Sequence, residues 1–470
     1  MATAPGRPTL VITNWRDLDH PQAGGAEVVC QELARRFVAR GWHVILLAAH
    51  VQGRARLETR DGYWIRRAGG RFTVYAHTLA WLARHRGRVD AVIDSQNGIP
   101  FFTPLALRPT TPDLLLLHHV HQDQFAHYFP WPIAQFGKFL ESTVSRAVYG
   151  QRGIVAVSPS TRSDARRRLG LRGEIWVAPP GWSVTVPTNL TRTLHPSIVC
   201  VGRLVPHKRT HLTVDAFSRV LQTHPDTRLT IIGRGPERQF LIDQARDAGI
   251  TEAVQFRDDL DDDARDRALA SAWFSVNPSQ GEGWGLSVIE ANALGVPVLA
   301  FRRPGLRDSI RDGYSGWLLE DTDDLASAMS DRITELRVSE SAETYRTNAR
   351  QWADQFTWEA MTDRVAAALA SEQSRLEHGP DERRARSDAA TVVAIPTGAL
   401  PREWRGLLRD TDVWEVNQHD LLILCRGADT SSVRLLLDRL EVADNDGVRV
   451  RVAGTSDLLR VSTPTPAAHD

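Results

Sequence analysis

Two carboxylates eight positions apart, Glu282 and Glu290, are the residues of this sequence whose type and spacing point most directly to chemistry. Glu282 lies in a glycine-rich loop after the apolar run 272–279, which predicts a buried strand ending in a turn. From Leu286 the apolar residues fall on one helical face, so Glu290 is expected on the following helix. Ligands bind at the carboxyl ends of strands in open α/β sheets. Two acceptor groups beside the N–H groups of a helix N-terminus suit a ligand with hydroxyls and phosphate, such as a nucleotide sugar.

Two cations are expected at the same edge of the sheet. Arg203 and Lys208 follow the predicted strand 197–201, on either side of a proline turn that leads into a helix. Lys208 is one of only two lysines among 57 basic residues, and the compact lysine ammonium is not interchangeable with a guanidinium. Fixed cations beside helix amides suit a diphosphate leaving group and can take the place of a metal ion. The alternative is an exposed basic turn.

Glycine turns follow two other predicted strands. Gly24 and Gly25 directly precede a helix, so their N–H groups either face a diphosphate across a cleft or only shape the chain. Gly233 begins a Gly-x-Gly turn after strand 228–232, but Arg238 stands where the dinucleotide fingerprint needs its third glycine. A dehydrogenase is therefore disfavoured, while approach to a phosphate or nucleotide and a plain tight turn remain equally open.

Three histidines end another predicted strand, 113–118. We expect His118 to contact a transferred sugar and His119 and His121 to be loop residues, because no carboxylate or cysteine nearby completes a zinc site. The acidic run 258–263 precedes a helix and is expected to cap it rather than to bind a metal ion. A nearby aromatic stretch could wall an acceptor, touch a membrane or belong to the core; it comprises Phe125, Tyr128, Phe129, Trp131, Phe136 and Phe139.

The elements that must position these residues alternate between strand and helix. Strands are expected at 10–13, 42–49, 89–94, 113–118, 153–158, 197–201, 228–232, 253–256, 273–277 and 297–301, with helices between most of them. This alternation predicts parallel sheets covered by helices on both faces. Its restart after a linker-like stretch, 187–196, predicts two doubly wound Rossmann-like domains that face a central cleft, an acceptor domain at 1–186 and a donor domain at 187–370.

The last hundred residues have a different pattern. A helix at 358–371 is expected to close the second domain, and the charged stretch 371–390 is expected to be a linker. Two short apolar runs, a helical stretch and a further run then predict a small α/β appendage at 391–470, to which no chemistry can be assigned.

Composition sets the broad class. The apolar fraction of 42% and the charged fraction of 24% are ordinary for a water-soluble protein, and no run approaches a membrane span or a signal peptide. Three scattered cysteines fit a reducing, cytoplasmic location. Residues 1–185 carry 23 basic and 13 acidic side chains, a net charge of +10 that could serve an anionic acceptor or the inner face of an anionic membrane, or simply be a solvated face. Nucleic acid is not expected as a partner, because no groove-reading motif is present.

Taken together, these motifs closely resemble the family-4 retaining glycosyltransferases of the GT-B fold, over about residues 9–370. The resemblance depends on the Gly-Gly-Ala-Glu turn from Gly24, His118, Val-Gly-Arg-Leu-x-x-x-Lys ending at Lys208, Gly-x-Gly-Pro from Gly233, and the pair Glu282 and Glu290. It implies an enzyme of glycan biosynthesis that moves a hexose-type sugar from a nucleoside-diphosphate sugar to a hydroxyl of a glycan, lipid or small metabolite. Neither a metal ion nor another cofactor is implied.

The resemblance also implies roles for individual residues. Catalytic roles fall to His118, Arg203, Lys208 and Glu282. Arg203 and Lys208 would hold the donor diphosphate, His118 would lie near the reacting carbon, and Glu282 would bind the sugar hydroxyls. The implied donor-binding residues are Gly24, Gly25, Gly233, Gly283, Trp284, Gly285, Leu286 and Glu290, with Glu290 on the ribose hydroxyls and backbone amides of 283–286 on phosphate. The acceptor proton would pass to a phosphate oxygen of the leaving group during attack on the same face.

Some features remain open. Arg257 and Asp258 stand where the family usually has a glycine near the nucleobase, so UDP-linked and GDP-linked donors are both expected candidates. An epimerase or hydrolase on the same fold would turn over donor without acceptor, and a non-catalytic nucleotide-sugar-binding protein would not turn it over. A glycosidase is disfavoured, because its two carboxyl groups would not need Arg203 and Lys208.

Overall fold

The computed structural model describes residues 6–123, 130–186 and 192–378, and in the C-terminal part residues 390–401, 404, 413–416, 419–426, 433, 436–437, 440–443 and 447–452. These residues form three sheets, of eight, six and four strands. Parts of the predicted connecting stretches, 187–191 and 379–389, lie outside the described residues. No helix of the described residues is both long and apolar enough to cross a bilayer.

The first domain is a mostly parallel sheet in the order β3-β4-β2-β1-β5-β6-β7-β8. Its strands are β1 (Thr9–Thr13), β2 (His43–Ala48), β3 (Leu57–Arg60), β4 (Tyr63–Arg67), β5 (Ala91–Asn97), β6 (Asp113–His119), β7 (Gly153–Ala156) and β8 (Ile175–Val177). Its helices are α1 (Gly25–Ala39), α2 (Val74–His85), α4 (Trp131–Phe139), α5 (Ser145–Tyr149) and α6 (Pro159–Arg167). The central strands are apolar without alternation because helices cover both faces, as Leu114 to Leu117 show by their complete burial.

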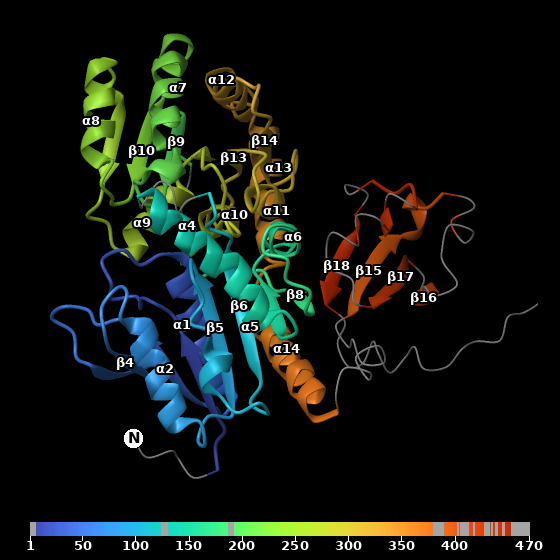
Figure 1. The fold of residues 1–470 in the computed structure, drawn as a ribbon. Coiled ribbons are helices and arrows are strands. Elements are labelled where there is room, and N and C mark those ends of the chain that lie inside the picture. The colour runs from blue at the N-terminus through green and yellow to red at the C-terminus, as the bar shows by residue number, and fades with distance from the viewer. Residues whose placement is uncertain are drawn as a thin grey trace, which may run out of the picture.

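The second domain is an all-parallel sheet in the order β11-β10-β9-β12-β13-β14. Its strands are β9 (Ser197–Val201), β10 (Arg228–Ile232), β11 (Val254–Arg257), β12 (Phe274–Asn277), β13 (Val298–Phe301) and β14 (Gly316–Leu319). Its helices are α7 (Thr210–Thr223), α8 (Arg238–Asp247), α9 (Asp262–Ala270), α10 (Leu286–Ala293), α11 (Leu306–Ser309), α12 (Leu325–Leu336) and α13 (Ser339–Ala353). Two doubly wound domains are therefore confirmed, one above the other in Figure 1.

The strand order reverses direction once in each domain, between β1 and β5 and between β9 and β12. Loops that leave the carboxyl ends of such neighbouring strands diverge to opposite faces of the sheet and open a crevice for a ligand. The loops concerned are those after β1 and β5 in the first domain, and those that carry Arg203, Lys208 and Glu282 in the second. The topology thus brings the predicted chemistry to the two crevices.

The helix α14 (Trp358–His378) differs from its predicted place. It was expected to close the second domain, but it packs against α1, β6, β7 and β8 of the first (Figure 1). Arg36 pairs with Glu359, and the backbone N–H of Gly153 donates to Glu372 at 3.0 Å. The helix also continues through His378, so the predicted linker from residue 371 begins later than expected. The difference arises because the apolar face of α14 completes the first domain's core, with Met361 and Val365 fully buried.

The appendage contains a four-stranded antiparallel sheet in the order β16-β17-β15-β18. Its strands are β15 (Ala390–Pro396), β16 (Val413–Val416), β17 (Asp420–Arg426) and β18 (Arg449–Val452). A separate apolar core includes Val393, Ile395, Leu421 and Ile423 together with Leu436 and Leu440. The predicted small appendage is present, although its strand β16 was not foreseen. In the two larger domains the elements not foreseen are β3, β4, β8, β14, α2, α4, α5, α11, α12 and α13.

Candidate active site

A cavity of about 900 Å³ lies between the two domains, at the carboxyl ends of their strands. Residues of both domains line it, including Trp15, Tyr75 and Asn97 from the first and Gly233 and Pro236 from the second. Six arginines also line it: Arg16, Arg71, Arg203, Arg234, Arg257 and Arg265. The lining acids are two aspartates, Asp258 and Asp262. Such a cleft concentrates positive potential where an anionic ligand would enter.

Lys208 and Glu282 meet at the ends of β9 and β12. The Lys208 ammonium donates to Oε1 of Glu282, which also accepts from the Ser279 hydroxyl at 2.8 Å. Burial alone would raise the pKa of Glu282, but the charge and hydrogen bonds of Lys208 and Ser279 outweigh it and hold the pKa below its ordinary value. Glu282 is therefore ionised at neutral pH, and sequence reasoning placed both residues at one strand edge correctly.

Glu290 lies on α10, half-buried, and its carboxyl behaves in the opposite way. Burial raises the pKa of Glu290 to about 7; Arg265 opposes this shift, and Asp266 and Asp262 add to it. A carboxyl with this pKa exchanges its proton near neutral pH. The two glutamates that the sequence singled out therefore differ in charge state, because one has a lysine partner and the other lies in a mostly desolvating environment.

His118 is the residue before the last in β6 and is buried. Its Nε2 atom lies 2.8 Å from the hydroxyl of Ser95, which accepts a weak hydrogen bond from the Cys30 thiol at 3.3 Å. Burial lowers the pKa of His118 to about 3, so the ring is neutral at physiological pH. A neutral ring fixed from behind can offer a polar contact to a sugar, but it is a poor proton acceptor.

The glycine-rich loop after β12 touches the first domain directly. A Cβ atom on Gly283 would lie 1.9 Å from the carbonyl oxygen of His118, and the Gly283 carbonyl accepts from the Thr161 hydroxyl at 3.2 Å. Gly285 is the N-cap of α10 with φ +102°, a left-handed conformation that favours glycine. The loop thus needs glycine for close backbone approach, and this approach brings the residue after Glu282 against the backbone of His118.

The Trp284 side chain is not in the cavity. It is buried in the apolar core, where its ring meets Phe356 edge to face with centroids 4.9 Å apart. The predicted donor contact from Trp284 is therefore limited to its backbone, as the resemblance implied for 283–286.

The turn before α1 differs in part from prediction. Gly24 is the N-cap, and its N–H donates to Oε2 of Glu27 at 2.7 Å, so this amide is engaged by a carboxylate rather than directed at a diphosphate. The reason is a capping box, which satisfies the end of the helix internally. A Cβ on Gly24 would lie 3.6 Å from Nε of Arg203, and one on Gly25 would lie 2.9 Å from Cδ1 of Leu286. Both glycines thus allow the second domain to approach.

Gly233 both lines the cavity and serves the sheet. A Cβ there would lie 1.8 Å from the carbonyl oxygen of Gly202, so the ends of β9 and β10 could not approach each other with any larger residue. The tight-turn interpretation is therefore confirmed. Gly233 also lines the cavity, so its contact with a nucleotide stays a prediction.

The sequence did not reveal Arg16, which is buried beside the cavity. It pairs with Oε1 of Glu27 at 3.0 Å and stacks on the Trp15 ring, with 4.1 Å from Cζ to the ring centroid. Burial lowers the pKa of Arg16, Glu27 raises it, and the positive charges of Arg203 and Arg71 lower it further. The guanidinium groups of Arg203 and Arg71 therefore repel that of Arg16, an arrangement that a bound anion would relieve.

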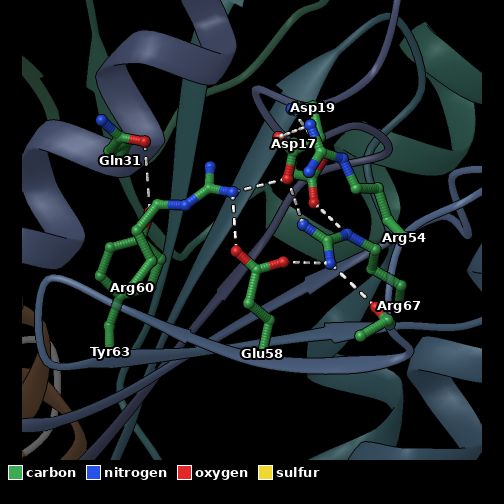
Figure 2. A network of polar contacts seen from close by, with 9 residues as sticks. Asp17, Asp19, Gln31, Arg54, Glu58, Arg60, Tyr63 and Arg67 are labelled. Carbon is green, nitrogen blue, oxygen red and sulfur yellow. Dashed lines mark hydrogen bonds and ion pairs between the residues drawn. The ribbon is translucent and has the colours of Figure 1, made fainter.

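Figure 2 shows the charged network that holds the loop carrying Arg16 in place. Arg67 is completely buried and donates to Asp17, to Asp19 at 2.6 Å, to Glu58 at 2.7 Å and to the Ala55 carbonyl at 2.9 Å. Arg54 and Arg60 also pair with Asp19, so three arginines balance three carboxylates. The β3–β4 hairpin is thereby fastened to the β1–α1 loop. No local sequence pattern predicts these pairs, because Arg67 lies 48 positions from Asp19 and 50 positions from Asp17.

The histidines after β6 and the acidic run 258–263 were the other candidates for a metal site. Among the residues that the structure describes, no group of three or more His, Cys, Asp or Glu side chains is arranged to hold a metal ion. His119 and His121 contact each other edge to face, with ring centroids 5.1 Å apart. Asp261 caps α9 by accepting from the N–H of Ala264 at 2.7 Å, which confirms the capping interpretation of the acidic run.

The aromatic stretch does not join the core where it is described. Phe125, Tyr128 and Phe129 lie outside the described residues, whereas Trp131, Phe136 and Phe139 are exposed on α4. The core interpretation of these three is therefore wrong: small residues of α4 face the protein instead.

Comparison with known proteins agrees with this geometry. Glycosyltransferase Family 4 matches residues 23–185, and Glycosyl transferases group 1 matches residues 189–352. A GDP-mannose-dependent alpha-(1-6)-phosphatidylinositol monomannoside mannosyltransferase of Mycolicibacterium smegmatis is 32% identical over 184 residues, which cover 37% of this chain and 47% of that protein. A D-inositol 3-phosphate glycosyltransferase of Acidothermus cellulolyticus is 32% identical over 205 residues, covering 38% and 46%. The chain spans about half the length of the curated relatives it matches.

Solved structures show the same architecture. Sucrose-phosphate synthase from Thermosynechococcus elongatus superposes with a TM-score of 0.65 at 19% identity, covering 77% of this chain and 98% of that one. WaaG, a glycosyltransferase involved in lipopolysaccharide biosynthesis, gives 0.61 at 16% identity, covering 77% and 99%. With two matched stretches, two doubly wound domains and a strand-end site between them, the chain belongs to family 4 of the glycosyltransferases and has the GT-B fold.

Proposed function

We propose that this chain is a retaining glycosyltransferase that moves a hexose-type sugar from a nucleoside-diphosphate sugar to a hydroxyl acceptor. The observation that carries the proposal is the meeting of Lys208 and Glu282 at one switch point, in a loop whose Gly283 touches the backbone of His118, a neutral histidine of the facing domain. A cation, an ionised acceptor of hydroxyl hydrogens and a polar ring then surround the place where a sugar phosphate would react. The family membership supports the same activity.

The donor would lie along the arginine-lined cavity. Arg203, which lines the cavity, and Lys208, next to the lining residue His207, would bind the diphosphate, with Arg16 close to Arg203 on the opposite wall. Glu290 would accept from the ribose hydroxyls, Glu282 from the sugar hydroxyls, and the amides at the start of α10 would bind phosphate. The Mycolicibacterium relative is named for GDP-mannose, and a structural neighbour from Anabaena was solved with UDP and glucose, so both bases stay candidates.

In the reaction, the bond from the anomeric carbon to the phosphate oxygen breaks and a bond from that carbon to the acceptor oxygen forms. The acceptor proton passes to a phosphate oxygen of the departing nucleoside diphosphate on the same face, which retains the anomeric configuration. His118 is too weak a base to take that proton near neutral pH, because its pKa is about 3. Arg203 and Lys208 would stabilise the charge that develops on the leaving diphosphate, and we propose that no metal ion is required.

The acceptor would enter from the first domain's side of the cavity, past Trp15, Arg71 and Tyr75. The basic excess of residues 1–185 supports either an anionic acceptor or peripheral contact with an anionic membrane, and we include that contact in the proposal.

The test is direct. Isothermal titration of the full chain with UDP-glucose and GDP-mannose, each with and without EDTA, should show binding of one donor that EDTA does not change. Arg203→Ala should weaken it by about tenfold or more. Arg219→Ala is the matched control, since that arginine pairs with Asp324 on an exposed face of the same domain. Proton NMR of the product sugar should show the donor's anomeric configuration. Binding of neither donor, or an inverted product, would overturn the proposal.

A further inference from the structure

The nine-residue helix α4 presents large apolar side chains to solvent. Trp131 is 75% exposed, Phe136 60%, Ile133 52% and Phe139 49%. Isolated exposed apolar residues are common on protein surfaces, but four on the outward side of one nine-residue helix are an unusual concentration. We refer to these four side chains as the α4 patch.

The orientation of α4 is the reverse of an ordinary surface helix. Ala134 and Gly137 are buried, and the same face continues into the fully buried Glu141 of the following π-helical turn, η2 (Leu140–Val144). With 3.6 residues per turn, the residues of the α4 patch lie on the opposite side of the helix. A surface helix normally turns its polar residues outward. Here the small residues face the protein and the large apolar ones face away from it.

The exposed charges of the segment that carries the α4 patch, residues 130–150, are basic. In residues 130–150 the acidic residue is Glu141, whose side chain is fully buried and accepts from the backbone N–H of His121 at 2.7 Å. The basic residues are Lys138 on α4 itself and the exposed Arg146 on α5. An outward apolar face with basic residues and no exposed carboxylate in its own segment complements an anionic surface.

The size of the patch selects among occupants. A nine-residue helix is about 14 Å long and about 10 Å wide, so its footprint is on the order of 140 Å². A stable protein interface needs about 800 Å² on each partner. A lipid bilayer sets no such minimum, because a short helix can lie in the interface with aromatic side chains at headgroup depth and basic ones beside lipid phosphates.

We propose that α4 docks this protein onto an anionic lipid bilayer, with Trp131, Ile133, Phe136 and Phe139 entering the headgroup region and Lys138 beside the lipid phosphates. Docking would orient the active-site cleft as well, because Glu141 holds His121 and His121 lines the cavity. This proposal rests on the membrane contact included in the proposed function and names the surface that makes it, and it does not depend on which sugar is transferred.

Vesicle sedimentation of the full chain tests it, with vesicles of phosphatidylcholine alone and vesicles containing a quarter phosphatidylglycerol. The unaltered protein should sediment with the anionic vesicles, less so with the neutral ones, and less as salt is raised. The double variant W131S/F136S should lose binding about tenfold or more, with an unchanged melting temperature because both side chains are exposed. Lys138→Gln should reduce binding to anionic vesicles only.

The matched control is Phe240→Ser, which alters an aromatic 56% exposed on α8 of the other domain. It should leave vesicle binding unchanged. The proposal fails if the unaltered protein stays in the supernatant with both vesicle types, or if the control loses as much binding as the double variant. It also fails if light scattering shows a dimer that W131S/F136S converts to monomer, since the patch would then bind a second copy.

Discussion

The ammonium of Lys208 and the carboxylate of Glu282 form an ion pair across the ends of two adjacent parallel strands, although 74 positions separate them in the chain. Neither side chain is more than about a fifth exposed, with 19% and 16% of their surfaces accessible. The pair lies at a topological switch point, the place where open α/β sheets bind ligands, and for this reason we assign it to the proposed site. It is the relationship on which the proposed chemistry depends most.

Replacing either member of the pair should abolish most of the transfer activity. We expect Lys208→Ala and Glu282→Ala each to lower kcat by about 10² to 10³, typical of losing one stabilising group at the reacting centre. The double variant should lose little more than the more damaged single variant, because the two residues act together. Steady-state kinetics on the donor identified by titration checks this, with Arg219→Ala as control. Full activity in either single variant would refute the assignment.

The protonation of Glu290 should make donor binding depend on pH near neutrality. Its raised pKa of about 7 leaves the carboxyl largely neutral at pH 6 and ionised at pH 8. Because only the ionised form accepts from two ribose hydroxyls, a sugar nucleotide should bind more tightly at pH 8 than at pH 6. The phosphates of the sugar nucleotide stay ionised throughout that range. Titration calorimetry at both pH values should show the difference in the unaltered protein and little of it in Glu290→Gln.

Ionisation of the Glu290 carboxyl should also change folding stability, in the direction opposite to its effect on donor binding. A carboxyl whose pKa is raised on folding stabilises the folded state fully below its unfolded pKa, and that contribution is lost as pH rises through about 7. Glu290→Gln removes the cost of the buried charge, so it should raise the melting temperature relative to the unaltered protein more at pH 8 than at pH 5. Equal shifts at the two pH values would show that Glu290 titrates normally.

The glycine-rich loop offers a sharp test of the domain contact. Gly283→Ala places a methyl group 1.9 Å from the backbone oxygen of His118, so something must move, at a cost of about 2 kcal/mol or more in the free energy of unfolding. Gly281→Ala is the matched control two positions away, where the nearest atom to the new methyl is 3.9 Å distant. Neither glycine has a positive φ. Urea unfolding should separate the two variants, and similar losses would contradict the contact.

The network around Arg67 should be a major source of stability for the first domain. Arg67→Met would leave Asp17, Asp19 and Glu58 without their buried partner, which typically costs about 3–5 kcal/mol. Arg66→Met, on the other face of the same strand, should change stability by less than about 0.5 kcal/mol. Because the network holds the loop that carries Arg16, Arg67→Lys should also weaken donor binding; unaltered affinity would separate the network from the site.

Much of this arrangement could be predicted from the sequence. Continuous apolar runs such as 114–117 mark buried parallel strands, and parallel strands place their carboxyl ends together, so Arg203, Lys208 and Glu282 could be assigned to one edge. The same logic placed His118 at the facing edge. These inferences succeed because they need only local periodicity and a general rule of sheet topology.

Other features could not be predicted, for physical reasons. Arg67 meets Asp17 and Asp19 only because the β3–β4 hairpin packs against a loop that is distant in the sequence. The one local sign of β3 is an alternating pattern of exposure, which is too weak to predict the strand. The Gly24 amide was assigned to a ligand because the sequence does not show whether Glu27 folds back as a cap. The destination of α14 depends on which core lacks a covering helix, a property of the whole domain and not of the segment.

Because α14 returns to the first domain, the chain crosses between the domains twice, and the two crossings touch. A Cβ on Gly181 would lie 2.3 Å from the backbone nitrogen of Trp358, the Trp358 indole donates to Ser183 at 2.7 Å, and the Trp182 indole donates to the Ala353 carbonyl at 3.1 Å. Two covalent tethers fastened at one place act as a single pivot. Rotation about it would leave the pivot still and move the parts of the cleft farther from it through longer arcs, so the cleft would open by rotation rather than by sliding.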